Sequence, residues 1–279
     1  MTTRPTRKKR PQTLAQTADK YDCYQQSVQS PDVDIEFFEQ AYKDAYGRTP
    51  YTLREDFCGT FSVCCEWAKS NAKRTAIGVD LCPEALQWGR DNNLAALTKA
   101  QQARVAVYQK DVRTASERKS DIVAAQNFSF WIFRTRAEMV DYFKIARANL
   151  KDEGVMVMDM MGGGDSFLEG HVEKRKIAKG PKGFSYHWEQ AEINPVTLEC
   201  THYIHFKFGD GSKMKRAFEY SWRFWSIPEI REMLEEAGFS KSIVYWEQED
   251  EDGEDTGEWA PGENAPSYPS WICYLVAVR

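Results

Sequence analysis

Two short stretches decide the fold of this chain: LREDFCGT at residues 53–60 and AIGVDL at residues 76–81. The first is typical of a buried strand that runs into a tight turn, and a helical pattern follows it from Phe61 to Ser70. The second is typical of another buried strand, and it ends in an acid, Asp80. Asp80 lies about 20 residues beyond the turn, the offset at which nucleoside-binding folds place a carboxylate on a ribose hydroxyl. The order predicts a strand–turn–helix–strand unit.

The turn itself differs from a loop that binds a dinucleotide. A G-x-G-x-x-G loop leaves space for a pyrophosphate at the N-terminus of the helix. Here Phe57 and Phe61 flank the turn residues 58–60, at positions where such loops often carry glycine. This leaves less room for a diphosphate, which argues against NAD or FAD and for a smaller nucleoside ligand without phosphates. Gly59 has no Cβ, so the backbone can approach a ligand closely there.

At this point the sequence resembles the class I S-adenosylmethionine-dependent methyltransferases, whose first motif reads roughly acid-x-G-C-G-T-G. The motif aligns with residues 55–61, where the matching residues are Glu55, Cys58, Gly59 and Thr60. The first and last glycines of the motif are phenylalanines in this chain. An ordinary strand–helix turn, in which the glycine serves geometry only, is the alternative.

The resemblance implies S-adenosyl-L-methionine as the cofactor. Glu55 and Asp80 are expected at its amino-acid and ribose ends, and Asp111, the acid after the third strand, at the adenine amino group. The alternative interpretation of Asp111 is a residue that serves only the turn after the third strand. The full set implied for the cofactor is Tyr24, Arg54, Glu55, Cys58, Gly59, Thr60, Asp80, Leu81, Asp111, Val112 and Asn127.

The hydrophobic pattern of the chain predicts an α/β fold of alternating strands and helices, and the resemblance implies a doubly wound Rossmann-like sheet of seven strands, of the class I methyltransferase type. The expected strands are residues 52–57, 75–80, 104–109, 121–125, 155–159, 242–247 and 272–278. The expected helices are residues 61–70, residues 83–92 and two that begin with capping boxes at Thr135 and Ser226. The resemblance implies that the last strand lies antiparallel between its neighbours. The acidic run 249–258 is interpreted as a solvated hairpin loop.

Three segments with alternating hydrophobicity, residues 184–192, 198–208 and 214–224, follow the fifth strand. Turn signals separate them, so they predict an inserted three-stranded antiparallel sheet, which could roof a substrate pocket. His187, His205 and Arg223 in this segment are candidates for a general base or an anion clamp, although a histidine in a strand is more often structural. In the resembled family the loop after strand four touches cofactor and substrate, which makes Asn127 the other catalytic candidate. The neighbouring Phe128 and Trp131 either form walls of the site or fill the core.

The expected domain boundaries follow from these elements. Residues 1–16 form a disordered basic tail and residues 17–50 an N-terminal helical lid, in which Tyr21, Tyr24 and Gln29 either cover the cofactor or pack on the domain. Residues 51–164 and 226–279 form the Rossmann-like domain that binds S-adenosylmethionine. Residues 165–225 form the inserted substrate-cap sheet.

Composition narrows the class of protein. Hydrophobic residues make up 42% and charged residues 28% of the 279, as in a soluble globular protein. No apolar run is long enough to span a membrane, and no apolar segment follows the basic residues 1–10, so we do not expect these residues to be a secretory signal. The seven cysteines form no C-x-x-C pair and fit no zinc site, so we expect reduced thiols in a cytoplasmic protein without a metal. A net charge of −5 gives no general attraction to nucleic acid.

The resemblance implies a methyltransferase that transfers a methyl group in line to a small-molecule amine or carboxylate, and the aromatic residues of the inserted segment are expected to line its pocket. The inserted sheet is architecturally similar to that of small-molecule N-methyltransferases, such as those acting on glycine and its methylated derivatives. Strand four ends in QNFS, residues 126–129, and lacks the Asn/Asp-Pro-Pro-Tyr/Phe run of many base-amino methyltransferases. Two alternatives stay open: an RNA or protein methyltransferase tethered by its basic tail, and a protein that binds the cofactor without turnover.

Overall fold

The structure is a computed structural model that describes residues 11–177, 180, 183–250, 252–253 and 255–279. The chain divides into two compact units. The first unit draws its described residues from 1–29, 170–192 and 201–220, and the second comprises residues 30–169, 193–200 and 221–279. The basic residues of the expected tail, within Met1–Arg10, lie outside the described residues.

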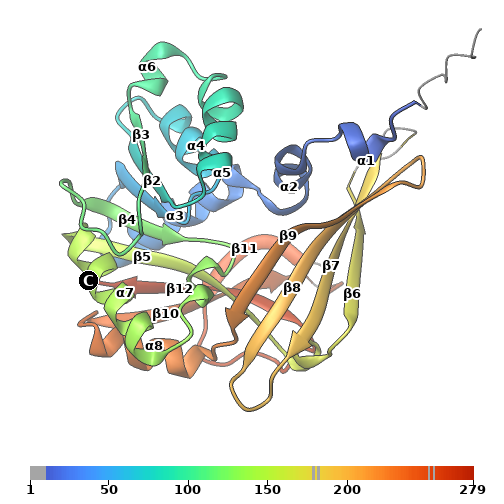
Figure 1. Cartoon of the computed structure of the whole chain (residues 1–279). Coiled ribbons are helices and arrows are strands. Elements are labelled where there is room, and N and C mark those ends of the chain that lie inside the picture. Colours follow the sequence, from blue (N-terminus) through green and yellow to red (C-terminus); the bar gives the residue numbers. More distant parts are fainter. Residues whose placement is uncertain (1–10, 178–179, 181–182, 251, 254) are drawn as a thin grey trace, which may run out of the picture. The chain divides into compact units, whose positions relative to one another are not determined.

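The second unit is built on one large sheet, whose strands run in the order β11-β10-β12-β5-β4-β1-β2-β3 (Figure 1). The strands are β1 (Thr52–Asp56), β2 (Thr75–Asp80), β3 (Val105–Gln109), β4 (Ser120–Ala125), β5 (Leu150–Gly162), β10 (Lys241–Glu249), β11 (Asp255–Pro261) and β12 (Trp271–Val278). The strands β1 to β5 pair in parallel, and β12 lies antiparallel between β5 and β10. The expected α/β sheet with an antiparallel closing strand is therefore confirmed.

The sheet has an eighth strand in the described part of the chain, so the expected count of seven was one too few. The acidic run 249–258 does join two antiparallel strands in a hairpin, as expected, but the loop is shorter than predicted. Part of that acidic run, with the residues up to Pro261, forms β11 and pairs antiparallel with β10. The sequence pattern did not predict this strand, because its acidic residues and glycines are typical of a loop and an edge strand needs few apolar side chains. Trp259 in β11 packs against the core and is partly buried.

Helices cover both faces of this sheet. They are α3 (Pro31–Tyr46), α4 (Ser62–Ser70), α5 (Pro83–Gly89), α6 (Lys99–Gln102), α7 (Arg136–Asn149) and α8 (Ile227–Glu236), with short helical turns at η1 (Arg90–Leu94), η2 (Ser129–Ile132) and η3 (Gly164–Phe167). Apolar residues of α3 and α4 share one core with Val155 and Val157 of β5. Met156 and Met158 point to the opposite face, since side chains alternate along a strand, and α7 packs against β5. This is the doubly wound arrangement.

Both predicted capping boxes are present. The Thr135 hydroxyl accepts the N–H of Glu138 at 3.2 Å at the start of α7, and the Ser226 hydroxyl accepts the N–H of Glu229 at 3.4 Å at the start of α8. The helix expected at 83–92 instead ends as α5 at Gly89 and continues as a π-helical turn. A Cβ on Gly89 would lie 2.4 Å from the Phe61 ring, so α5 packs directly on the turn after β1.

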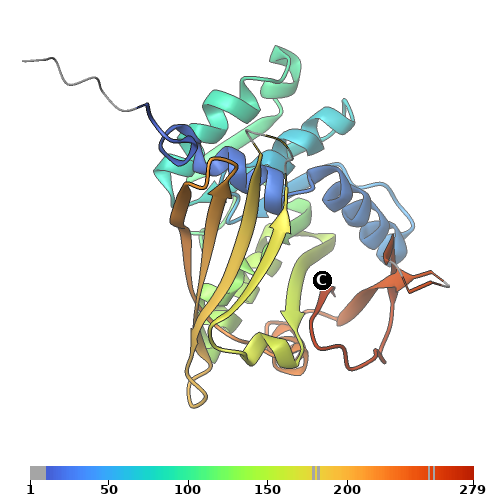
Figure 2. The same cartoon turned by 90° about the vertical axis from the view of Figure 1, so that its right-hand side faces the viewer.

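The first unit contains most of a second sheet, in the order β6-β7-β8-β9. The strands are β6 (His171–Lys176), β7 (Phe184–Ile193), β8 (Glu199–Phe208) and β9 (Lys213–Arg223), and Figure 2 shows them side by side in yellow to orange. The expected three strands were one too few, because β6, with the sequence HVEKRK, has only Val172 as an apolar residue and is defined by its pairing with β7. The unit also holds α1 (Leu14–Thr17) and α2 (Lys20–Val28).

Candidate functional site

The turn after β1 has the backbone of a glycine-rich loop although two of its positions carry phenylalanine. Phe57, Gly59 and Phe61 have φ angles of 58°, 52° and 47°, all in the left-handed region. This conformation costs roughly 1–2 kcal/mol at a residue other than glycine. Packing offsets the cost: the Phe61 ring is fully buried, and the Phe57 ring lies 5.7 Å from that of Tyr142. A Cβ added to Gly59 would meet no atom within 4 Å, so the space beside this glycine is open.

Asp80 joins this turn to the end of β2. Its Oδ2 accepts the N–H of Gly59 and its Oδ1 accepts the N–H of Cys82, both at 2.7 Å. The structure thus brings together the two residues on which the sequence analysis depends. Each carboxylate oxygen keeps a free lone pair for a further donor. The adjacent Leu81 side chain is 61% exposed, an unusual position for a large apolar residue.

Glu55 lies buried beneath the turn. Its Oε2 accepts the N–H of Cys64 at 3.1 Å, in the first turn of α4. Burial raises the pKa of the Glu55 carboxyl to about 8, and the negative charges of Asp34 and Asp80 contribute to the rise. Cys58 and Thr60 are also buried. Their side chains point into the protein, so only their backbone groups face the turn.

Two acids that the sequence analysis did not select lie close to this group. Asp34, in the first turn of α3, accepts the hydroxyl of Tyr274 at 3.2 Å. Burial, followed by repulsion from Asp159, raises the pKa of Asp34 to about 7. Burial also raises the pKa of Asp159, in the last part of β5, to about 6. Asp159 closes the buried run VMVMD, residues 155–159, just as Asp80 closes AIGVD, so the same signal points to it.

Asp159 also shapes the loop after β4. It accepts the N–H of Asn127 at 2.8 Å and that of Phe128 at 2.9 Å. Both residues are left-handed, with φ angles of 57° and 55°. The carboxylate therefore fixes the loop that carries the catalytic candidate Asn127. Trp131, proposed as a wall of the site, is instead fully buried and packs 4.9 Å from the Phe224 ring.

Arg54 and Val112 form a buried link rather than an open surface. The Arg54 guanidinium is paired with Asp56 at 2.6 Å and donates to the Val112 carbonyl at 2.7 Å. It thereby anchors the segment after β3. Asp111 in that segment binds the Arg113 guanidinium at 2.7 and 3.1 Å, and this bond lowers the pKa of the Asp111 carboxyl. Contacts of Arg54, Asp111 and Val112 with a cofactor stay predictions.

The remaining candidates occupy different settings. Tyr24 on α2 lies 4.9 Å from the ring of Phe218, and His187 on β7 has its Nε2 3.0 Å from the hydroxyl of Ser185; both belong to the first unit. Arg223 belongs to the second unit. Its guanidinium stacks 3.8 Å from the Trp225 ring and donates to the Arg134 carbonyl at 3.0 Å. These contacts support the local fold, and the catalytic roles of His187 and Arg223 stay predictions.

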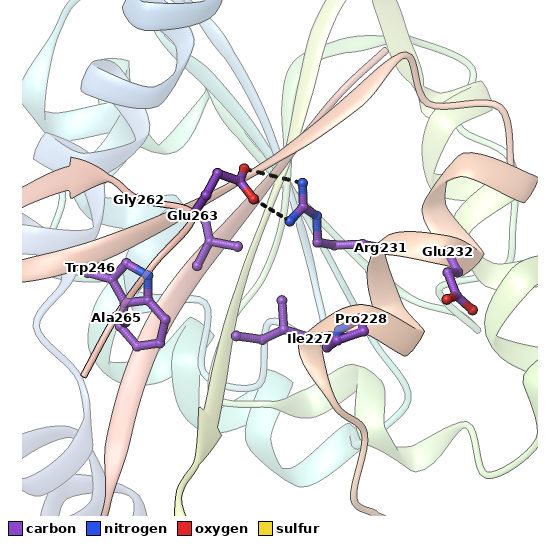
Figure 3. A pocket seen from close by; sticks show the side chains of 9 residues that line it. Ile227, Pro228, Arg231, Glu232, Trp246, Gly262, Glu263 and Ala265 are labelled. Carbon is purple, nitrogen blue, oxygen red and sulfur yellow. Dashed lines mark hydrogen bonds and ion pairs between the residues drawn. The ribbon is translucent and has the colours of Figure 1, made fainter. Parts of the chain in front are cut away.

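A separate hollow of about 390 Å³ lies between α8 and β10 (Figure 3). Arg231 and Glu263 form a bidentate ion pair across it, at 2.8 and 3.3 Å, above the side chains of Ile227 and Trp246. None of the predicted site residues lines it. Among the described residues there is also no group of acids, histidines and cysteines suited to a metal ion, and no helix long and apolar enough to cross a membrane.

No protein-family model and no curated protein matches the chain. Solved structures do. CalS10 from Micromonospora echinaspora, an amino pentose methyltransferase with bound S-adenosylmethionine, has a TM-score of 0.66 and 16% identity over 93% of this chain and 95% of its own. The sugar N-methyltransferase KedS8 from Streptoalloteichus has a TM-score of 0.63 and 17% identity over 100% and 98%.

DesVI from Streptomyces venezuelae has a TM-score of 0.67 and 15% identity over 94% of this chain and 98% of its own. At these low sequence identities the similarity is one of backbone fold, and it extends over nearly the whole length of each chain. The chain therefore has the fold of the class I S-adenosylmethionine-dependent methyltransferases.

Proposed function

We propose that this protein is an S-adenosylmethionine-dependent methyltransferase that methylates an amino group of a small molecule. The observation that carries the proposal is a group of mutually repelling carboxyl groups, Asp34, Glu55, Asp80 and Asp159, in a fold of this type. Asp80 ends the parallel strand β2, and Asp159 follows Met158, the last residue of β5 that pairs with the parallel strand β4, so both lie at the edge where open α/β sheets bind ligands. A ligand with a sulfonium and an ammonium group relieves such repulsion, whereas the diphosphate of a dinucleotide increases it.

The residues present fit this cofactor. The open space at Gly59 lets the backbone approach it, and Asp80 has acceptor capacity for ribose hydroxyls. The exposed Leu81 side chain supplies an apolar surface for the adenine. Glu55 and Asp34 would face the amino-acid end, where the positive charge of the ligand favours their ionised form. When bound, the cofactor supplies an electrophilic methyl group on a positively charged sulfur.

The residues of the chain would mainly position the substrate next to the methyl group and accept a proton from the substrate amine. Bringing the substrate nitrogen and the methyl group together in a water-poor site lowers the barrier by about 7–11 kcal/mol. An amine must lose its proton before it can attack. The pKa values of Asp34 and Asp159, about 7 and about 6, suit a group that accepts a proton near neutral pH. We assign this role to the pair and leave the choice between them to mutagenesis.

An amine is favoured over a carboxylate as the acceptor for two reasons. The acidic group attracts an ammonium substrate and repels a carboxylate. The similar structures include an amino pentose methyltransferase and a sugar N-methyltransferase. Both act on sugars, which are small molecules, and this supports the same class of acceptor here.

Isothermal titration with S-adenosylhomocysteine tests the proposal. We expect binding by the wild type and at least about tenfold weaker binding by Asp80→Ala, because a charged hydrogen-bond acceptor is lost. Asp91→Ala removes an exposed carboxylate of the nearby π-helical turn and serves as the matched control. Undetectable binding by the wild type, or equal binding by both variants, would contradict the proposal.

A methyl-uptake screen then identifies the acceptor. Small amines, carboxylates and amino sugars are incubated with labelled cofactor, and we expect uptake by amines. A chain lacking residues 1–10 is tested in parallel. Activity of that chain on a small amine excludes the alternative in which a basic tail tethers an RNA or protein substrate.

A further inference from the structure

The sheet of the first unit has two chemically different faces. Side chains alternate along its strands, so Phe184 and Tyr186 join an apolar cluster with Cys23 of α2. The alternate residues, Ser185 and His187, face the other way. On that second face the described residues enclose a hollow of about 480 Å³, lined by Val172, His187, Glu189, His205, Lys213, Lys215 and Arg216.

A hydrogen bond and a close carboxylate contact hold His205 in the wall of this hollow. The Nδ1 atom of His205 accepts the N–H of Arg216 at 3.0 Å, so the ring proton is on Nε2, which lies 2.8 Å from Oε2 of Glu189. Arg216 has a left-handed φ of 49°, which marks an irregular point in β9, and its guanidinium covers the ring of Tyr203 at 4.3 Å. The contacts of His205 and Arg216 therefore fix the positions of these side chains in the wall of the hollow.

The charge of the hollow is strongly positive. Lys174 pairs in register with His187, and Lys207, Lys213 and Lys215 lie on the neighbouring strands. Burial lowers the pKa of His187, and the positive charges of Lys174, Lys207 and Lys213 lower it further. Glu189 is the single acid that lines the hollow among the described residues, and it is already engaged with His205. A bound anion would reduce the repulsion among these positive charges.

We propose that this hollow binds a small phosphate-bearing anion, of which inorganic pyrophosphate is the simplest probe. The inference goes beyond the proposed methyl transfer and does not depend on it. The volume suits a small ligand, because pockets for such molecules measure about 300–1,000 Å³. A nucleic-acid strand is disfavoured, because the Tyr203 ring is covered by Arg216 and offers no free surface for a base to stack on.

Isothermal titration of the full chain with pyrophosphate tests this site. We expect binding that weakens about tenfold in the double variant Lys213→Gln/Lys215→Gln, since two cation contacts to the anion are lost. Both lysines are exposed, so the variant keeps its fold. The control is Lys99→Gln/Lys241→Gln, which removes the same charge from exposed positions of the second unit. It should bind pyrophosphate like the wild type.

The pH dependence gives a second, independent measurement. The affinity for pyrophosphate, taken relative to that of the variant His187→Gln, should rise as the pH falls below about 6.5, because the anion stabilises the protonated form of His187 and the proton uptake of pyrophosphate itself is common to both proteins. The variant His187→Gln should show a flatter dependence. The proposal is overturned by undetectable binding, by equal loss in the control, or by RNA oligonucleotides that bind more tightly than pyrophosphate with an affinity that rises with length.

Discussion

Replacing Glu55 with glutamine should make the protein more stable at alkaline pH. Glu55 is 4% exposed and has a pKa of about 8 in the fold, against 4.5 for an ordinary glutamate. Between these values the folded state holds a proton that the unfolded state has lost. The free energy of unfolding therefore falls as the pH rises from 4.5 to 8, and the accumulated loss has an upper limit of about 5 kcal/mol.

The glutamine variant has no such proton to lose. Its amide oxygen can still accept the N–H of Cys64, so the local hydrogen bond is kept. Urea unfolding at about pH 5, 7 and 9 measures the free energy of unfolding of both proteins. We expect nearly equal stability at pH 5 and a growing advantage of the variant above it. Glu66→Gln, on the outer side of α4, is the control and should follow the wild type.

Parallel pH profiles of wild type and Glu55→Gln would refute this reasoning, because they would mean that the carboxyl ionises as freely in the fold as in the unfolded chain. The same variant separates stability from function. If Glu55 provides charge for the cofactor, the stabilised variant binds S-adenosylhomocysteine more weakly than the wild type. Unchanged binding would remove Glu55 from the proposed site without affecting the account of its pKa.

Three further predictions follow from the same region. Asp159→Asn keeps one acceptor oxygen for the two backbone N–H groups that the carboxylate now accepts, so urea unfolding should show a loss of about 1–3 kcal/mol; an unchanged midpoint would contradict it. Gly59→Ala should lose about 1 kcal/mol from its left-handed backbone and also lose affinity for S-adenosylhomocysteine, whereas Gly47→Ala, equally left-handed and equally open, should lose stability alone. S-adenosylmethionine binding at pH 7 should release protons, because a cationic ligand lowers the raised pKa values of Glu55 and Asp34; titration in buffers of different ionisation enthalpy measures the release, and none should be seen if these acids do not face the ligand.

The sequence by itself determined the elements whose signals are local. The strand and turn at 53–60, the strand that ends at Asp80 and the capping boxes at Thr135 and Ser226 all lie where the pattern predicted them. Helical periodicity, buried runs and caps involve residues only a few positions apart, so these features can be predicted from the sequence alone. The α/β order of these elements was enough to predict the doubly wound sheet.

Only the tertiary structure decided the features that depend on distant partners. The edge strands β6 and β11 form because neighbouring strands pair with them. Their own sequences have few apolar residues and no clear alternation that would predict a strand. Asp159 reaches a loop 31 and 32 residues away, and Arg54 anchors a carbonyl 58 residues away. The raised pKa values of the acids arise from burial among side chains from several elements. Such burial and pairing are properties of packing in three dimensions, which no local pattern encodes.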